Sequence, residues 1–156
     1  QPFYVKGASM EPNFYDREYL VIDEISYRFH PPSRGDIIVF RPPGQAGQYF
    51  IKRVIGLPGE TVTIAKGAIY VSANAKSKGT KLDESSYLPL IYTPGELQVT
   101  LKADEFFILG DNRASSLDSR AFGPLPKSNI VGRVWIRGWP LEKAGTIAVP
   151  SYPVGG

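Results

Sequence analysis

The sequence predicts an all-β protein with an antiparallel core, barrel-like or sandwich-like, that carries a smaller inserted β subdomain. Three observations lead to this prediction. Apolar and β-branched residues occur in short runs, and the 16 glycines and 14 prolines recur between those runs in turn-forming sequences. No long stretch shows the 3.6-residue spacing of an amphipathic helix. Many short strands with regular turns between them are typical of β barrels and sandwiches.

The core is expected to comprise residues 1–65 and 104–142. Valine, isoleucine and aromatic residues, which favour the pleated surface of a sheet, are concentrated in its short runs. The runs that we expect to form strands are 19–23, 36–41, 49–55, 61–65, 105–109 and 130–137. Turn sequences such as SRGD, PPG and LPGE separate several of them, which predicts chain reversals between antiparallel neighbours.

An inserted β subdomain is predicted over residues 66–103. It contains the apolar runs 68–72 and 97–101, and between them lies the polar stretch ANAKSKGTKLDESS, which we interpret as an exposed loop. The last residues, 143–156, show no pattern of a buried strand, and they are predicted to form an extended C-terminal tail.

The composition excludes several kinds of chemistry. The chain has no cysteine, so disulfides, thiolate catalysis and cysteine metal sites are excluded. Its one histidine, His30, lies in a proline-rich loop, which argues against a Ser-His-Asp triad and a histidine-rich metal site. We expect no cofactor and no metal, although a site built from carboxylates alone stays open. The net charge of +3 is spread along the chain without a dense basic stretch, so no nucleic-acid partner is expected.

The sequence contains no membrane-spanning segment. No stretch approaches the roughly 20 consecutive apolar residues that a spanning helix needs, and no signal peptide opens the chain. The chain begins abruptly at Gln1, without an initiator methionine. We therefore interpret it as part of a longer protein.

Ser9, in the turn-like sequence GASMEP, is the first candidate for catalysis. A serine nucleophile needs a base to accept its proton, and with histidine nearly absent the candidate base is lysine. A free lysine has a pKa of about 10.4, so it serves as a base at neutral pH only where burial destabilises its ammonium form. Taken alone, a serine in such a sequence is more often an ordinary turn residue.

Lys52, in the apolar run YFIKRVI, fits the requirement for a buried lysine best. Strand geometry places Lys52 on one face together with Phe50 and Val54, while Arg53 points to the other face. Apolar neighbours would lower the pKa of the Lys52 amine. The alternative, in which the stem packs and the ammonium reaches water, stays open on this evidence.

A third candidate segment, residues 109–123, follows a predicted strand directly. Its sequence, LGDNRASSLDSRAFG, packs two acids, two arginines, an asparagine and three serines into a short stretch. Such a composition also suits a solvated loop with Asx turns, and by itself the segment does not decide between the two interpretations.

Together these stretches, with RGDIIVF at 34–40 and IKRVIGLPGE at 51–60, resemble the type I signal peptidases of the bacterial or thylakoid type. That family consists of membrane-anchored Ser-Lys endopeptidases that remove signal peptides. The resemblance runs in family order over nearly all of residues 3–139, and in the last motif it includes GDNR at 110–113 and residues as far as Gly123.

The resemblance implies roles for three residues and marks one departure. Ser9 would be the nucleophile and Lys52 the general base. Ser116 would hydrogen-bond the lysine amine and orient it, and the N–H of Ser9 would help to form the oxyanion hole. Gly7 stands where some family members have a serine whose hydroxyl is a second oxyanion donor, so that donor would be backbone or absent here.

The resemblance also implies bracing and substrate-binding residues. Charged groups expected to brace the site are Arg53, Asp111, Asp118 and Arg120. Residues expected at shallow substrate pockets are Val5, Gly7, Met10, Phe14, Phe50 and Ile51. The substrate would lie extended along strand edges near residues 5–8 and 49–51, with small residues one and three positions before the cut, the A-x-A pattern.

The implied partners are signal peptides of preproteins and a membrane. The resemblance predicts a membrane helix upstream of this chain, in the plasma or thylakoid membrane, with the catalytic domain on the periplasmic, extracytoplasmic or lumenal side. Trp135 and Trp139 would then either join a bilayer-facing surface or pack in the core. Two rival interpretations remain: a self-cleaving repressor of the Ser-Lys type, and a non-catalytic β module that binds peptides or glycans.

Overall fold

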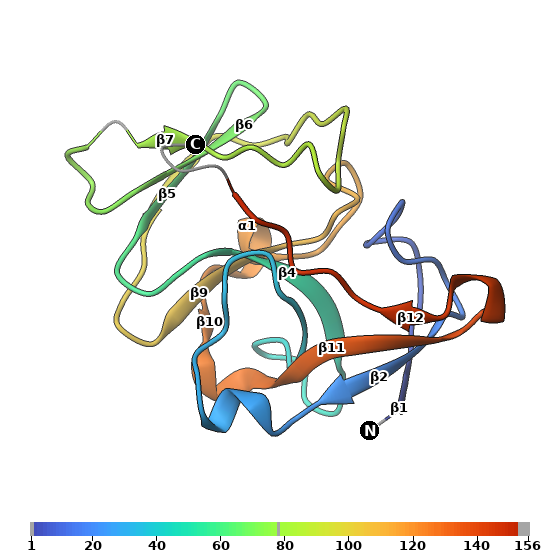
Figure 1. Cartoon of the computed structure of the whole chain (residues 1–156). Coiled ribbons are helices and arrows are strands. Elements are labelled where there is room, and N and C mark those ends of the chain that lie inside the picture. The colour runs from blue at the N-terminus through green and yellow to red at the C-terminus, as the bar shows by residue number, and fades with distance from the viewer. Residues whose placement is uncertain (1, 78, 153–156) are drawn as a thin grey trace.

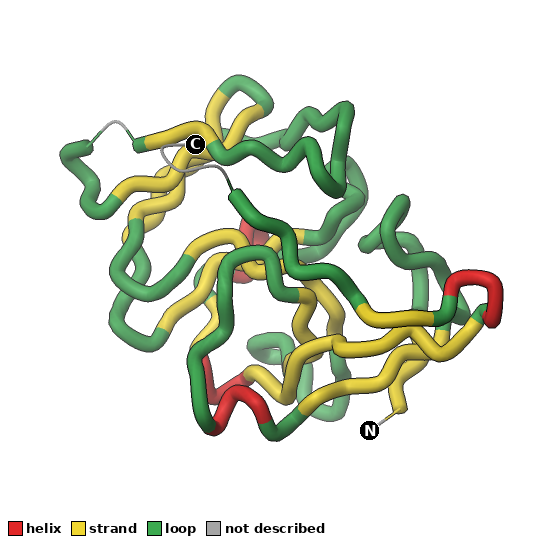
Figure 2. Tube along the Cα trace, viewed as in Figure 1, coloured by secondary structure: helices red, strands yellow, loops and turns green. Residues whose placement is uncertain are grey.

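The computed structural model describes residues 2–77 and 79–152 and contains two antiparallel sheets (Figures 1 and 2). The larger sheet has the strand order β1-β2-β11-β3-β4-β9-β10, with β12 paired to β11, and the smaller has the order β7-β6-β5-β8. Only short helical segments accompany them among the described residues: α1 (Ser119–Phe122), η1 (Ser26–Arg28), η2 (Lys127–Asn129) and η3 (Leu141–Lys143). The predicted all-β fold is therefore confirmed.

The strands of the large sheet come from both ends of the chain. They are β1 (Pro2–Tyr4), β2 (Tyr19–Asp23), β3 (Ile37–Phe40), β4 (Phe50–Gly56), β9 (Glu105–Leu109), β10 (Leu125–Pro126), β11 (Ile130–Trp139) and β12 (Gly145–Thr146). The long strand β11 pairs with both β2 and β3, and its register shifts at bulges, which bend a strand and increase its twist. The sheet consequently curls around one of its faces (Figure 1).

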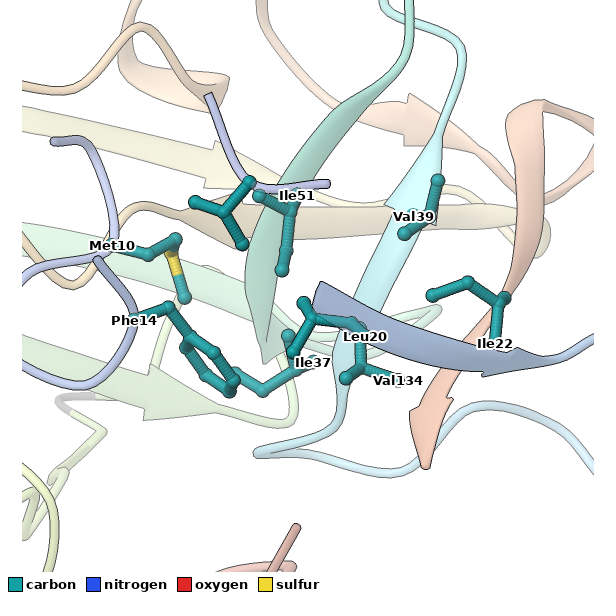
Figure 3. Packing of buried hydrophobic residues seen from close by; sticks show 9 residues of the cluster. Met10, Phe14, Leu20, Ile22, Ile37, Val39, Ile51 and Val134 are labelled. Carbon is teal, nitrogen blue, oxygen red and sulfur yellow. The ribbon is translucent and has the colours of Figure 1, made fainter. Parts of the chain in front are cut away.

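Hydrophobic clusters cover both faces of this sheet. On one face, residues of β2, β3, β4 and β11 pack with the segment that follows β1, and Figure 3 shows this cluster around Phe14 and Leu20. The opposite face packs a second cluster that includes Ile38, Phe40 and Val54. All four residues of β3 are buried for this reason, and β4 lies inside the sheet, between β3 and β9.

The small sheet consists of β5 (Thr61–Ala65), β6 (Ala68–Ser72), β7 (Thr80–Lys81) and β8 (Leu97–Thr100). It includes residues 61–65, which were expected in the core, because β5 pairs along its length with β6 and β8. Gly56 ends β4 where the chain turns toward this sheet, and a Cβ there would lie 2.5 Å from the Val62 side chain. Glycine at this position therefore permits the close approach of the two sheets.

The C-terminal segment is docked on the protein although its sequence shows no core pattern. β12 pairs with β11, and Ile147 packs against the cluster of Figure 3. The chain then runs toward the small sheet (red in Figure 1), where the Tyr152 ring packs and its hydroxyl lies 2.8 Å from that of Tyr87. Residues 145–152 therefore join the two sheets, and residues 153–156 of the predicted tail lie outside the described residues.

Over the described part of the chain, no helix combines the length and apolar character required to cross a bilayer.

We predict that Tyr152→Phe lowers the free energy of unfolding by about 1 kcal/mol, because it removes one partly buried hydrogen bond. For a domain of this size, the expected fall in melting temperature is about 2–4 °C. Tyr92→Phe is the matched control, since Tyr92 is 68% exposed. Equal melting temperatures for the two variants would contradict a stabilising Tyr87–Tyr152 contact.

Candidate active site

Ser9 and Lys52 meet although 43 residues separate them. The Lys52 Nζ donates hydrogen bonds to Ser9 Oγ at 2.8 Å and to the Ile51 carbonyl at 2.9 Å. Lys52 is only 4% exposed and comes from an interior strand, where it pairs opposite Ile38. Ser9 lies in the turn after β1. The serine is thus placed by a loop and the lysine by the sheet.

The surroundings of Lys52 lower its pKa. Burial is the largest effect and lowers the pKa of the amine from its ordinary 10.5 to about 8, although the charges of Asp118 and Asp111 act in the opposite direction. The Phe50 ring lies 5.2 Å from Nζ, so it contributes apolar surface on one side of the amine. About one Lys52 in ten is then neutral at pH 7, against roughly one in a few thousand for a free lysine.

The Ser9 turn is anchored to the segment after β9. The Asn112 backbone N–H donates to the Ser9 carbonyl at 2.9 Å, and its side-chain amide donates to the Ala8 carbonyl at 3.0 Å. The Gly7 N–H donates to Asp16 Oδ1 at 2.8 Å, so Gly7 does not offer its N–H as a second oxyanion donor. The described hydrogen bonds leave the Ser9 N–H unused.

Gly110 lies against the Ser9 turn without room for a side chain. A Cβ at this position would lie 2.6 Å from the Ser9 carbonyl oxygen and closer still to the Ser116 side chain. Asp118 Oδ2 accepts the Gly110 N–H at 3.0 Å and thereby fixes this backbone. Glycine is required here by close packing, since only hydrogen occupies the space that a Cβ would fill.

Ser116 does not make the hydrogen bond to Lys52 that the family resemblance implies. Its buried hydroxyl has no hydrogen-bond partner among the described residues, and its side chain lies against Gly110. The amine of Lys52 instead donates to the Ile51 carbonyl as well as to Ser9. In this structure the lysine is therefore oriented by its own strand, and an orienting role for Ser116 stays a prediction.

Two buried ion pairs lie beside the dyad. Arg53 binds Asp111 through two hydrogen bonds of 2.8 and 2.7 Å, on the face of β4 away from Lys52. Arg120 likewise binds Asp118 through bonds of 2.9 and 2.8 Å, while Asp118 also accepts the Arg120 N–H at the start of α1. The four charged residues that were expected to brace the site thus form two bidentate pairs, which hold both carboxylates in fixed positions.

A third buried ion pair was not expected from the sequence. Arg113 binds Glu84 through both guanidinium nitrogens and donates to Thr93 Oγ1, while the Tyr87 hydroxyl donates to Glu84 at 2.6 Å. Glu84 stands in the polar run LDESS, which has the composition of an exposed loop. No local signal distinguishes it, because its burial depends on contact with the segment after β9.

A cleft of about 480 Å³ opens at the dyad. Its lining combines the end of β1 with the start of β4: Phe3, Tyr4, Lys6, Ser9, Gly47, Gln48, Tyr49, Phe50, Ile51, Lys52 and Leu117. Of the predicted pocket residues, Phe50 and Ile51 line it.

The other predicted pocket residues lie elsewhere. Val5, Met10 and Phe14 are at most 2% exposed and belong to the cluster of Figure 3, beneath the cleft, because the curl of the sheet encloses them. The Met10 sulfur accepts the Asp111 N–H at 3.3 Å. Gly7 is exposed and is absent from the cleft lining. Tyr4, at the end of β1, and Lys6, two residues after it, also line the cleft; Lys6 falls within the strand edge expected near residues 5–8, whereas Tyr4 was not indicated by the sequence.

The described residues include no cluster of three or more potential ligands that could hold a metal ion. At the cleft, a buried amine is hydrogen-bonded to a serine hydroxyl.

Comparison with known proteins supplies independent evidence. The sequence model of the family described as signal peptidase, peptidase S26, matches residues 1–139. Signal peptidase I from Leptolyngbya laminosa is 40% identical over 96% of this chain and 74% of the relative. Signal peptidase I V from Bacillus subtilis is 34% identical over 83% of this chain and 80% of the relative. A crystal structure of a signal peptidase I from Enterococcus faecalis superposes with a TM-score of 0.55 and 32% identity, covering 66% of this chain and 96% of that one.

Lys52 is expected to make stability depend on pH. Its folded pKa of about 8 lies below the ordinary 10.5, so between these values the unfolded chain binds more protons and stability rises with pH. Lys52→Met lacks this titration. Between about pH 7 and about pH 10, the free energy of unfolding of wild type should therefore rise by about 2–3 kcal/mol more than that of Lys52→Met.

Denaturant titrations of both proteins across this pH range measure the difference. Lys102→Met removes an exposed lysine and is the control. If the difference in free energy of unfolding between wild type and Lys52→Met stayed constant with pH, the prediction that burial destabilises the charged Lys52 amine would be wrong. The same holds if Lys102→Met showed an equal change.

Proposed function

The chain belongs to the signal peptidase family, peptidase S26, and on this basis we propose that it is a serine endopeptidase that cuts signal peptides by means of a Ser9–Lys52 dyad. The observation that carries the proposal is the 2.8 Å hydrogen bond between the buried Lys52 amine and the Ser9 hydroxyl. The family match favours this function over a self-cleaving repressor and over a non-catalytic β module.

The proposed reaction proceeds in two stages. Ser9 Oγ attacks the scissile carbonyl while neutral Lys52 accepts its proton, and the oxyanion of the tetrahedral intermediate is stabilised by the Ser9 N–H. The C–N bond then breaks, and the leaving amine takes the proton from Lys52, which leaves an ester on Ser9. In the second stage Lys52 accepts a proton from water as the water attacks the ester, and the proton returns to Ser9 Oγ as the acid departs.

The open strand edges on either side of the cleft suit an extended substrate. The N–H and the carbonyl of Val5 both form hydrogen bonds with the segment that leads into β2. Because backbone groups alternate in direction along a strand, the N–H and carbonyl groups of Tyr4 and Lys6 point away from β2. Across the cleft, β4 pairs with β9 only from Arg53 onward. Residues 50–52 therefore keep one edge open to a peptide strand.

The proposed cleavage site has small residues one and three positions before the cut. Phe50 and Ile51 line the cleft together with Ser9, and Ile51 also belongs to the buried cluster of Figure 3. We expect these apolar side chains to bound shallow subsites that favour Ala-x-Ala over larger side chains.

The family is membrane-associated with its catalytic domain on the extracytoplasmic side. We propose the same location for this domain, at a plasma or thylakoid membrane. Trp135 and Trp139 are 48% and 54% exposed, so they are available to a bilayer surface rather than buried in the core.

Cleavage of a synthetic peptide with an Ala-x-Ala signal-peptide cut site tests the proposed reaction. Wild-type kcat/KM should rise with pH through about 8, as Lys52 loses its proton. Ser9→Ala and Lys52→Arg should each lower the rate by about three orders of magnitude or more, since the arginine stays protonated. Retained turnover in Lys52→Arg, or a rate that does not depend on pH between about 6 and 9, would contradict lysine as the base.

Gly110→Ala tests whether the backbone contact with Ser9 positions the nucleophile. A Cβ 2.6 Å from the Ser9 carbonyl oxygen must displace the turn, so kcat should fall by about 100-fold. Gly44→Ala is the matched control, because its Cβ meets nothing within 4 Å although φ is +73°; it should cost stability but leave kcat near wild type. Equal kcat values for the two variants would contradict the positioning role of Gly110.

A further inference from the structure

Lys6 places a second positive charge at the cleft. Its side chain is exposed, it lines the cleft three residues before Ser9, and no aspartate or glutamate is among the described lining residues. Lys6 forms no ion pair with any described residue. The nearby Asp16 is engaged by the Gly7 N–H at 2.8 Å and lies 3.7 Å from Arg17. The Lys6 ammonium is therefore available to a bound molecule.

The direction of Lys6 follows from the alternation along β1 and the residues after it. Val5 is 2% exposed and faces the buried cluster, whereas Tyr4 is 59% exposed and Lys6 is exposed as well. Side chains of adjacent paired strands that lie on one face of a sheet contact one another. A substrate strand beside this edge therefore presents alternate residues to the Val5 side and to the Lys6 side.

We propose that Lys6 selects an acidic side chain at the substrate residue two positions before the cut, between the two small residues. This inference rests on the proposed function, and it places the residues one and three positions before the cut on the side of Val5 and Ile51, which belong to the buried cluster. The intervening residue then points to the opposite face, along which Tyr4 and Lys6 lie. A glutamate or aspartate there meets the ammonium of Lys6, and a lysine or arginine meets a like charge.

The size of the preference follows from the exposure of Lys6. Ion pairs between solvent-exposed groups are weak, so an acidic residue should improve kcat/KM by about two- to five-fold over a neutral one, and a basic residue should reduce it by a similar factor. Salt screens such a pair, so the preference should shrink at about 1 M NaCl.

The experiment uses three peptides that differ only in this residue: Ala-Glu-Ala, Ala-Gln-Ala and Ala-Lys-Ala. Measurements at about pH 9 keep most of Lys52 neutral, so that the substrate charge acts mainly through Lys6 and not through the base. Wild type should cut the peptides in the order Glu, Gln, Lys. Lys6→Gln should remove the preference, Lys6→Glu should reverse it, and Lys102→Gln, which removes an exposed lysine outside the cleft, should preserve it.

The outcomes separate the two proposals. If wild type fails to cut the Gln peptide, or if Ser9→Ala cuts it equally well, the proposed function is overturned. If the Gln peptide is cut in a Ser9-dependent way but the three peptides react equally, or if Lys6→Gln keeps the wild-type preference, the selectivity assigned to Lys6 is overturned.

Discussion

The desolvation of one amine is the constraint on which the rest of the structure depends. In the proposed reaction Lys52 accepts a proton from Ser9 near neutral pH, which requires the lowering of its pKa to about 8 by burial. Burial of a lysine destabilises the fold, so the position is tolerated only where the surrounding strands are held firmly in place. β4 meets this condition, since it pairs with β3 at Lys52 itself and with β9 from the next residue, Arg53, onward.

The buried ion pairs reduce the effect of the nearby carboxylates on the pKa of this amine. Asp111 and Asp118 raise the pKa of Lys52, which opposes the proposed role of its amine as a base. Arg53 and Arg120 each bind one of these carboxylates through two hydrogen bonds, and a nearby guanidinium offsets the carboxylate charge that the amine experiences. The same carboxylates hold Asn13 and the Gly110 backbone, so they contribute to the geometry of the Ser9 turn.

The small sheet and the C-terminal segment pack near the face of β4 that lies away from Lys52. The Arg53 guanidinium lies 3.8 Å from the centre of the Tyr87 ring, and Tyr87 in turn contacts Glu84 and Tyr152. Residues from three distant parts of the chain therefore meet behind the strand that carries Lys52. The edge of β4 opposite β3 has no β9 partner at residues 50–52, which is where the proposed substrate strand would pair.

The sequence by itself determined the all-β fold and most of the core strands, because strand alternation is a local property. The lack of alternative bases indicated Lys52 as the candidate base, but only the resemblance to the type I signal peptidases pointed to Ser9 and Lys52 as a pair. The tertiary structure decided what depends on contact between distant segments. It buried Glu84 despite its polar neighbours, placed Val5, Met10 and Phe14 beneath the cleft, and left the Ser116 hydroxyl without a partner. It also made β1 an edge strand that brings Lys6 to the cleft. Burial and strand order are properties of the assembled sheet, and no short stretch of sequence specifies them.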